Sequence, residues 1–89
     1  MIKVLLYDDS DQFREAIALL LGGSEGFEVA GSFNNCETAA ADIDMLKPDV
    51  ILMDIDMPGA TGIDGVRMIR EKNDSVKIIM LTVFDNNQN

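Results

Sequence analysis

The spacing of apolar residues along the chain changes period several times, and each change predicts a new element of secondary structure. Short runs that are apolar throughout predict strands covered on both faces, whereas an apolar residue at every third or fourth position predicts a helix with one buried side. On this basis we expect strands at residues 2–7, 49–54 and 76–84, and the alternating pattern of residues 27–31 predicts another short strand. Helices are expected in the three intervals between them.

Capping and turn residues indicate where these helices begin and end. In a capping box, two residues three positions apart exchange side-chain and backbone hydrogen bonds, and such boxes are expected to open the second and third helices. Adjacent glycines should close the first helix. Proline should close the second, because the residue before proline avoids helical backbone angles. The expected boxes are Asn34 with Glu37 and Thr61 with Asp64, and the expected closing residues are Gly22, Gly23 and Pro48. The apolar residues expected to face the sheet are Phe13, Ala16, Ile17 and Leu20 in the first helix, Cys36, Ala39, Ala40, Ile43 and Leu46 in the second, and Ile63, Val66 and Ile69 in the third.

The order of elements is therefore β-α-β-α-β-α-β. Strands that alternate with helices over short connections predict a parallel sheet with right-handed crossovers. Pro58, Gly59 and Gly62 indicate a turn in the loop after the third strand. No repeat or linker interrupts the pattern, so we expect one α/β domain over residues 1–89.

Composition and charge narrow the possible functions. The chain has 16 acidic and 7 basic residues, and its net charge of −9 should repel phosphate backbones, so we expect no nucleic acid to bind this segment. It has no histidine, which excludes most hydrolase triads and imidazole metal sites. No apolar run approaches the roughly 20 residues of a membrane-spanning helix. A single cysteine, Cys36, favours a reducing, cytoplasmic setting.

Polar side chains occur at the ends of three predicted strands. Asp8 and Asp9 end the first strand and Asp54 ends the third, while Thr82 has the corresponding place in the fourth. Parallel sheets of this kind bind ligands outside the C-terminal ends of their strands. If the first and third strands are neighbours, the three carboxylates converge at one edge. Such convergence is unfavourable unless a cation or protons offset the charge.

The chemistry that suits this cluster is phosphoryl transfer with a bound cation. All-oxygen ligands with room for water favour Mg²⁺ over zinc, and a carboxylate beside Mg²⁺ is able to attack a phosphoryl group. Asp54 is the best-placed nucleophile because it ends the most apolar strand, and the hydroxyl of Thr82 is a candidate donor to a phosphoryl oxygen. Taken singly, the residues have ordinary explanations: Asp8 and Asp9 as helix caps, Asp54 as a turn residue and Thr82 as a strand residue. Their joint placement favours a site.

The segments that carry these residues resemble a known family. The matching segments are residues 4–9, residues 48–54, the loop 55–59 with Gly62, and residues 78–82. Over its whole length the chain resembles the receiver domains of two-component response regulators, most closely the branch that carries a C-terminal helix-turn-helix DNA-binding domain. The resemblance implies a flavodoxin-like α/β fold with a parallel sheet in the order 2-1-3-4. It also implies a role in phosphorelay signal transduction and transcription regulation.

The resemblance further implies a role for each candidate residue. Asp54 would accept a phosphoryl group from a phosphohistidine on a sensor histidine kinase. Asp9 and Asp54 would ligate Mg²⁺ directly, with the backbone carbonyl of Asp56 as a third ligand and Asp8 acting through the water shell. Thr82 would follow the phosphoryl group and signal its presence. Such a domain modifies itself and does not turn over a separate substrate, so we do not expect an enzyme.

Receiver domains continue through a fourth helix, a fifth strand and a fifth helix, and a lysine ends that last strand. This sequence stops at Asn89, and Lys77 lies at the start of its strand. The resemblance therefore implies a receiver domain truncated after the fourth strand. Residues 77–84 would then form an edge strand, through which we expect self-association.

Two alternatives remain open. Residues 54–56 have the acid-x-acid pattern of phosphatases in the haloacid dehalogenase superfamily, and Thr82 imitates its second motif. That superfamily begins with the paired-aspartate strand, however, whereas Asp8 and Asp9 come first here, and no lysine follows Thr82. The other alternative is an interaction fragment that folds with a partner and takes no phosphate.

Overall fold

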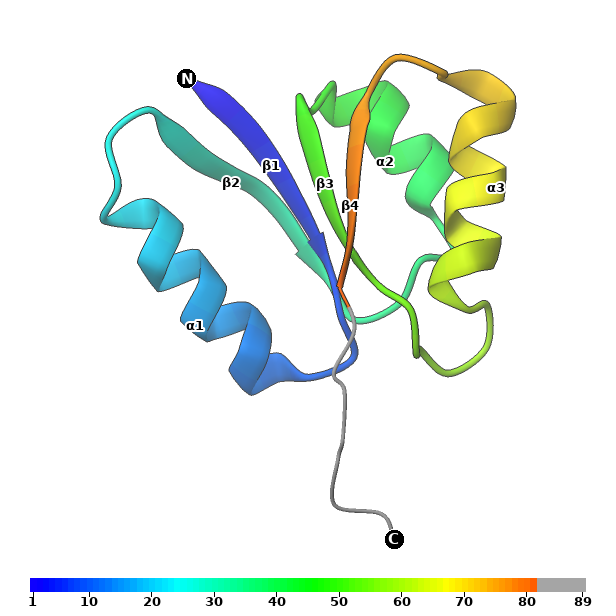
Figure 1. Cartoon of the computed structure of the whole chain (residues 1–89), viewed down its shortest axis with the longest axis horizontal. Helices are drawn as coiled ribbons and strands as arrows, with labels where there is room; N and C mark the ends of the chain where they lie inside the picture. The colour runs from blue at the N-terminus through cyan, green and yellow to red at the C-terminus, as the bar shows by residue number, and fades with distance from the viewer. Residues whose placement is uncertain (82–89) are drawn as a thin grey trace, which may run out of the picture.

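The computed structural model describes residues 1–81, in which strands and helices alternate as the apolar pattern predicts. Figure 1 shows this alternation along the chain. The elements are β1 (Ile2–Tyr7), α1 (Asp11–Gly22), β2 (Phe27–Phe33), α2 (Ala39–Leu46), β3 (Val50–Asp54), α3 (Gly62–Lys72) and β4 (Lys77–Leu81).

The four strands of the described region form one parallel sheet in the order β2-β1-β3-β4. This is the order of the flavodoxin-like fold, which confirms the expected fold class. β1 and β3 lie at the centre of the sheet, and both are almost wholly apolar. In β3, Ile51 and Met53 face the buried core and the residues that alternate with them are half-buried. Because β1 and β3 are parallel neighbours, their C-terminal ends emerge side by side at one edge.

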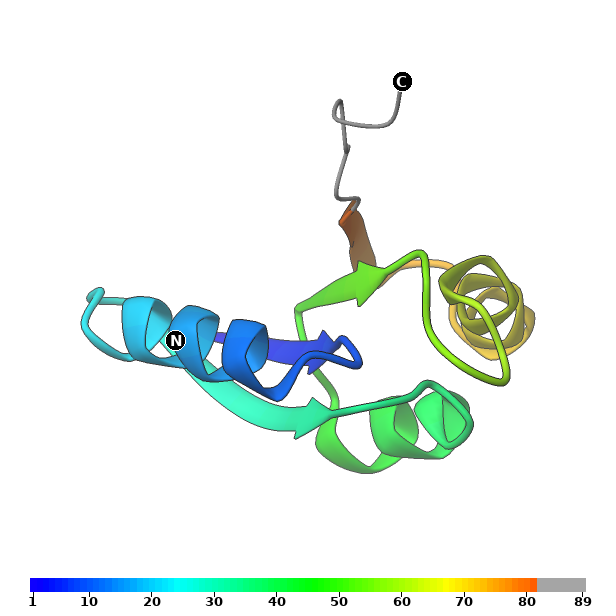
Figure 2. The same ribbon diagram turned by 90° about the horizontal axis from the view of Figure 1, so that it is seen from below.

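The helices lie on opposite faces of the sheet. α1 packs over β2 on one face, whereas α2 and α3 lie together on the other (Figures 1 and 2). The buried core lies between the sheet and the two helices α2 and α3. Its members are Leu5, Tyr7, Cys36, Ala39, Ile43, Ile51, Met53, Met57, Ile69 and Val76. The core thus packs against β1 and β3, the two strands whose C-terminal ends carry the acids.

The inward face of α1 differs from the expected stripe. Of the four apolar residues expected to face the sheet, Leu20 is 67% exposed and Phe13 is 38% exposed. The less exposed positions are Arg14, Ile17, Ala18 and Leu21. The helix is turned this way because it contacts the sheet at β2, where the Arg14 side chain bonds to Ser32. Apolar spacing alone could not show that an arginine occupies the inward face.

The start of α2 also differs from the expectation, and the predicted box of Asn34 with Glu37 is wrong. The N-cap is Thr38, without a side-chain capping bond. Instead, the side chain of Asn35 accepts a 3.0 Å hydrogen bond from the Glu37 amide. Asparagine side chains compete in this way with helical hydrogen bonding. As a result, Cys36 lies in a turn before the helix and not on its buried stripe.

The third helix begins as predicted. In the capping box, the Asp64 amide donates to the Thr61 hydroxyl at 3.3 Å and the Thr61 amide donates to the Asp64 carboxylate at 3.1 Å. Ile69 is buried, but Ile63 is 51% exposed because it lies in the first turn, beyond the edge of the core. No helix among residues 1–81 is long and apolar enough to cross a membrane.

Candidate functional site

Three carboxylates meet where β1 and β3 end. Parallel pairing sets Tyr7 opposite Met53, so Asp8 and Asp54 leave the sheet at the same edge. One carboxylate oxygen from each of Asp8, Asp9 and Asp54 lies within 4.8 Å of the others. The first and third strands are thus neighbours, and the convergence expected from their ends is present.

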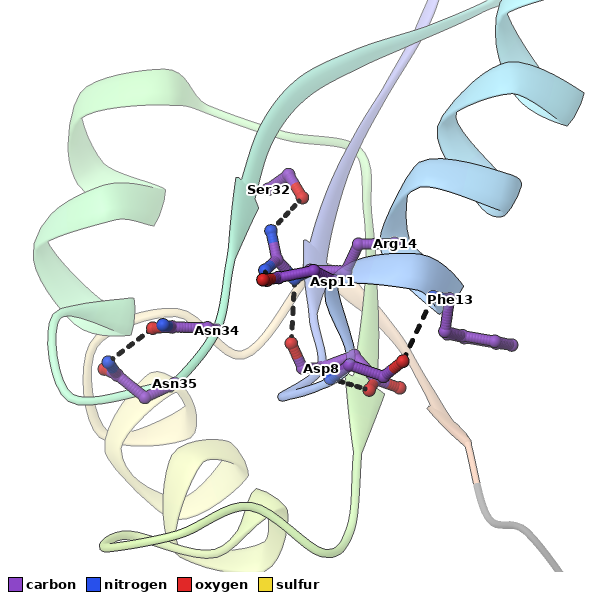
Figure 3. A network of polar contacts seen from close by, with 8 residues as sticks. Asp8, Asp11, Phe13, Arg14, Ser32, Asn34 and Asn35 are labelled. Atoms are coloured by element: carbon purple, nitrogen blue, oxygen red, sulfur yellow. Dashed lines mark hydrogen bonds and ion pairs between the residues drawn. The ribbon is translucent and has the colours of Figure 1, made fainter.

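Asp8 is held by hydrogen bonds to each of its polar groups. Its amide donates to the Phe33 carbonyl at 3.1 Å, and its carboxylate accepts from the Ser10 amide at 2.8 Å. Its backbone carbonyl accepts from Nε of Arg14 at 2.8 Å (Figure 3). Only 9% of the residue is exposed. These bonds fix the backbone at the end of β1.

The cap of α1 is Ser10, not either of the two acids before it. The Ser10 hydroxyl accepts a 3.1 Å hydrogen bond from the Phe13 amide. The ordinary explanation of Asp8 and Asp9 as N-cap residues is therefore wrong, and the exposed Asp9 carboxylate faces the cluster instead.

Asp54 lies in a setting that disfavours its charge. Burial at the end of β3 raises the pKa of this carboxyl above its ordinary value, and the neighbouring carboxylates of Asp8, Asp9 and Asp56 raise it further. The Asp56 amide opposes this shift by donating to Oδ1 of Asp54 at 3.3 Å. A cation among the carboxylates would relieve the same repulsion.

The cluster opens into a cavity of about 510 Å³. Its walls include the side chains of Phe13, Asp56 and Leu81 beside the three converging acids. This volume leaves room for a cation with bound water and for a phosphoryl group. Thr82, the remaining candidate from the sequence, lies outside the described residues.

The loop after β3 is shaped by close packing against Asp54. The amide of Gly62 donates to the Ile55 carbonyl at 2.9 Å, and a Cβ on Gly62 would overlap the carbonyl group of Asp54. Only glycine fits so near a backbone. On the other side of the loop, the Cys36 thiol donates to the carbonyls of Ala60 and Thr61 at 3.3 and 3.4 Å.

The donor set suits a hard divalent cation. All three converging side chains are carboxylates, and hard cations such as Mg²⁺ and Ca²⁺ take oxygen ligands. After burial, repulsion from Asp8, Asp9 and Asp56 contributes to the raised pKa of Asp54, and a bound cation would offset that repulsion. The residues present therefore fit a metal of this class.

Two contributions to the site were missed in the sequence. Arg14 bonds to the backbone of Asp8, and Cys36 anchors the loop before α3. The sequence did contain a signal for Arg14: it lies three residues before Ile17, at the helical spacing of the residues that face the sheet. Nothing in the sequence pointed to the hydrogen bonds of Cys36, because its partners are backbone carbonyls of a distant loop.

Comparison with known proteins agrees with this geometry. The family model of the response regulator receiver domain matches residues 4–89. The transcriptional regulatory protein LnrK of Bacillus subtilis is 40% identical over 84 residues, which are 94% of this chain and 38% of that protein. Response regulator GacA of Pseudomonas syringae pv. syringae is 36% identical over 85 residues, 96% of this chain and 40% of that protein. The chain thus spans about two fifths of the length of these relatives.

Solved structures show the same fold. The response regulator domain of Thermotoga maritima CheB superposes with a TM-score of 0.85 at 33% sequence identity. The match covers 92% of this chain and 60% of that one. Since the family model spans nearly all of the sequence and the strand order agrees, this chain belongs to the response regulator receiver domain family.

Proposed function

We propose that Asp54 accepts a phosphoryl group from a sensor histidine kinase, with Mg²⁺ bound at the acid cluster. The observation that carries this proposal is the approach of carboxylate oxygens of Asp8, Asp9 and Asp54 to within 4.8 Å of one another, in a chain of the receiver family. Asp54 is the acceptor because it ends a central strand and faces the cavity.

The proposed ligand set is the one that the family resemblance implies, and the approach of the three acids supports it. The carboxylates of Asp9 and Asp54 would hold Mg²⁺ directly, with the backbone carbonyl of Asp56 as the third protein ligand. Asp8, whose Oδ1 accepts the Ser10 amide, would act through the water shell of the metal. Bound Mg²⁺ supplies positive charge to the oxygens of the transferring group.

The proposed step joins one carboxylate oxygen of Asp54 to phosphorus while the bond from phosphorus to the kinase histidine breaks. The electron pair of that bond leaves with the imidazole, and the product is an aspartyl phosphate. The Asp56 amide orients the acceptor through its bond to Oδ1. We also propose that Thr82 donates its hydroxyl to a phosphoryl oxygen.

Intact-mass measurement tests this function. With a small acyl-phosphate donor and MgCl₂, the chain should gain the mass of one phosphoryl group, and a chelator should prevent the gain. This measurement and a separate phosphomonoester turnover assay distinguish the alternatives. A phosphatase would turn over a phosphomonoester many times, whereas a receiver releases no more than its own label. An interaction fragment would take no label under any condition.

The proposed partners are the histidine kinase and a second copy of the chain. Among the described residues, β4 pairs only with β3, so its outer edge presents unpaired amides and carbonyls. We propose that copies associate through this edge. A reducing, cytoplasmic compartment is also proposed, in keeping with one buried free cysteine.

A further inference from the structure

Arg14 links the start of α1 to the end of β1 and to β2. Its Nε donates to the Asp8 carbonyl at 2.8 Å, its Nη1 donates to the Ser32 hydroxyl at 2.9 Å, and its Nη2 pairs with the Asp11 carboxylate (Figure 3). The side chain is only 15% exposed. A planar guanidinium holds its donors in a fixed fork, so this arrangement fixes the direction of each bond.

The bond to Asp8 acts on the peptide unit that joins two of the three acids. The carbonyl of Asp8 and the amide of Asp9 belong to one planar group. The orientation of that plane sets where the Asp9 side chain leaves the backbone. The amide and carboxylate of Asp8 bond to other groups, whereas its carbonyl accepts from Arg14 in the part of the chain that the structure describes.

Arg14 forms its ion pair with Asp11, which is not one of the three acids of the cluster. The Asp11 side chain is 83% exposed, and the hydrogen bond toward the cluster goes to a neutral carbonyl. The guanidinium therefore does not occupy the oxygens that would bind a cation. We propose that Arg14 is a positioning residue that orients the Asp8–Asp9 peptide so that both carboxylates face Asp54. This inference rests on the proposed Mg²⁺ site.

A purely electrostatic role and a positioning role of Arg14 predict opposite changes in Mg²⁺ affinity when the residue is replaced. Removal of a positive charge near an acidic site should tighten cation binding if charge alone matters. Loss of an orienting hydrogen bond behind metal ligands should weaken binding, by about 10-fold, as is typical when a partner of a ligand is lost. The direction of the change in Mg²⁺ affinity therefore distinguishes the two.

The test compares Mg²⁺ titrations of the full chain with those of Arg14→Gln, Arg14→Lys and Ser32→Ala. Ser32→Ala is the matched control, because it removes the bond from Arg14 to β2 and keeps the bond to Asp8. We expect Arg14→Gln to weaken Mg²⁺ binding about 10-fold, Arg14→Lys to give an intermediate value and Ser32→Ala to stay near the parent. Equal or tighter binding by Arg14→Gln would overturn the proposal. If Arg14→Gln does not fold, Arg14→Lys replaces it in the test. This variant keeps the charge, so weaker Mg²⁺ binding supports the positioning role and unchanged binding overturns it.

A second measurement needs no metal. In amide NMR spectra of the metal-free chain, Arg14→Gln should shift and broaden the Asp9 amide more than Ser32→Ala does. If both variants change the spectrum alike, Arg14 only ties α1 to β2 and the proposal fails. If the parent binds no Mg²⁺ while the Asp9 amide responds as expected, the metal site fails and the positioning role stands.

Discussion

At the scale of single residues, Asp54 combines burial with like charge. Both raise its pKa, with burial the larger cause. Such a carboxyl lowers the stability of the folded chain whenever it is ionised, since the unfolded chain carries no such penalty. The acid cluster is therefore a local source of instability, which a bound cation would offset.

This instability predicts a pH dependence in metal-free buffer. Because the pKa of Asp54 is higher in the folded state, the folded chain binds the proton first as the pH falls. The penalty is complete above the raised pKa and disappears as the pH falls through it toward the ordinary value of about 4. The free energy of unfolding should accordingly increase from neutral to mildly acidic pH. Urea titrations at a series of pH values measure this change.

Asp54→Asn is the informative variant in that series, and Asp74→Asn is its control. Asp74 is exposed in the turn before β4, so its loss changes the net charge equally without touching the cluster. Asp54→Asn should flatten the pH profile and Asp74→Asn should not. Equal profiles for the parent and Asp54→Asn would show that the cluster is not strained.

The acids of the site could be predicted from the sequence, whereas the residues that hold them could not. Asp8, Asp9 and Asp54 follow apolar strands directly, and parallel strands of this fold place such residues at one edge. Arg14 and Cys36 act through backbone carbonyls, whose positions depend on the completed fold.

At the scale of elements, the start of α3 is packed against the end of β3. Gly62, the first residue of α3, lies so close to Asp54 that a Cβ would come within 2.8 Å of the Asp54 carbonyl carbon and 2.9 Å of Cα of Ile55. The contact is with backbone, which cannot rotate away. The direction in which Asp54 points therefore depends on the absence of a side chain at residue 62.

Gly62→Ala should accordingly destabilise the chain by about 1–3 kcal/mol, the usual cost of overpacking, and should weaken Mg²⁺ binding. Gly22→Ala is the matched control, because no atom lies within 4 Å of its Cβ position and it ends a helix. That change should be neutral or stabilise by up to about 1 kcal/mol. Urea unfolding measures both, and a Gly62→Ala variant as stable as the parent would contradict the packing.

The boundaries of the helices were predictable to different degrees. The box of Thr61 with Asp64 opens α3 as its spacing indicates. The same spacing at Asn34 does not form a box, since the neighbouring Asn35 bonds to the Glu37 amide. Local hydrogen bonds of this kind compete with each other at similar energies, and the sequence pattern does not show which one forms.

At the scale of the whole molecule, the alternation of strands and helices predicted a parallel sheet, and the family resemblance implied its strand order. Both are confirmed. The orientation of α1 was not predictable, because it depends on which part of the sheet the helix covers. In the described region α1 lies over β2, and the same face of β4 carries Ile79 at 51% exposure.

We predict that the chain self-associates through β4, as judged by sedimentation velocity over a dilution series. Ile79→Lys should shift the chain toward monomer, because a charge on an edge strand opposes pairing with another strand. Leu19→Lys is the control: Leu19 is 79% exposed on α1, away from that edge. A parent chain that stays monomeric at high concentration, or equal effects of the two lysines, would count against the β4 interface.

The most direct test of the central claim is to map the phosphoryl group to one residue. After reaction with a small acyl-phosphate donor and MgCl₂, borohydride converts an aspartyl phosphate to homoserine, which peptide mass spectrometry locates. The account predicts homoserine at residue 54 alone and no labelling of Asp54→Asn. Homoserine at residue 8, 9 or 56 in the parent chain, or label that persists in Asp54→Asn, would contradict it.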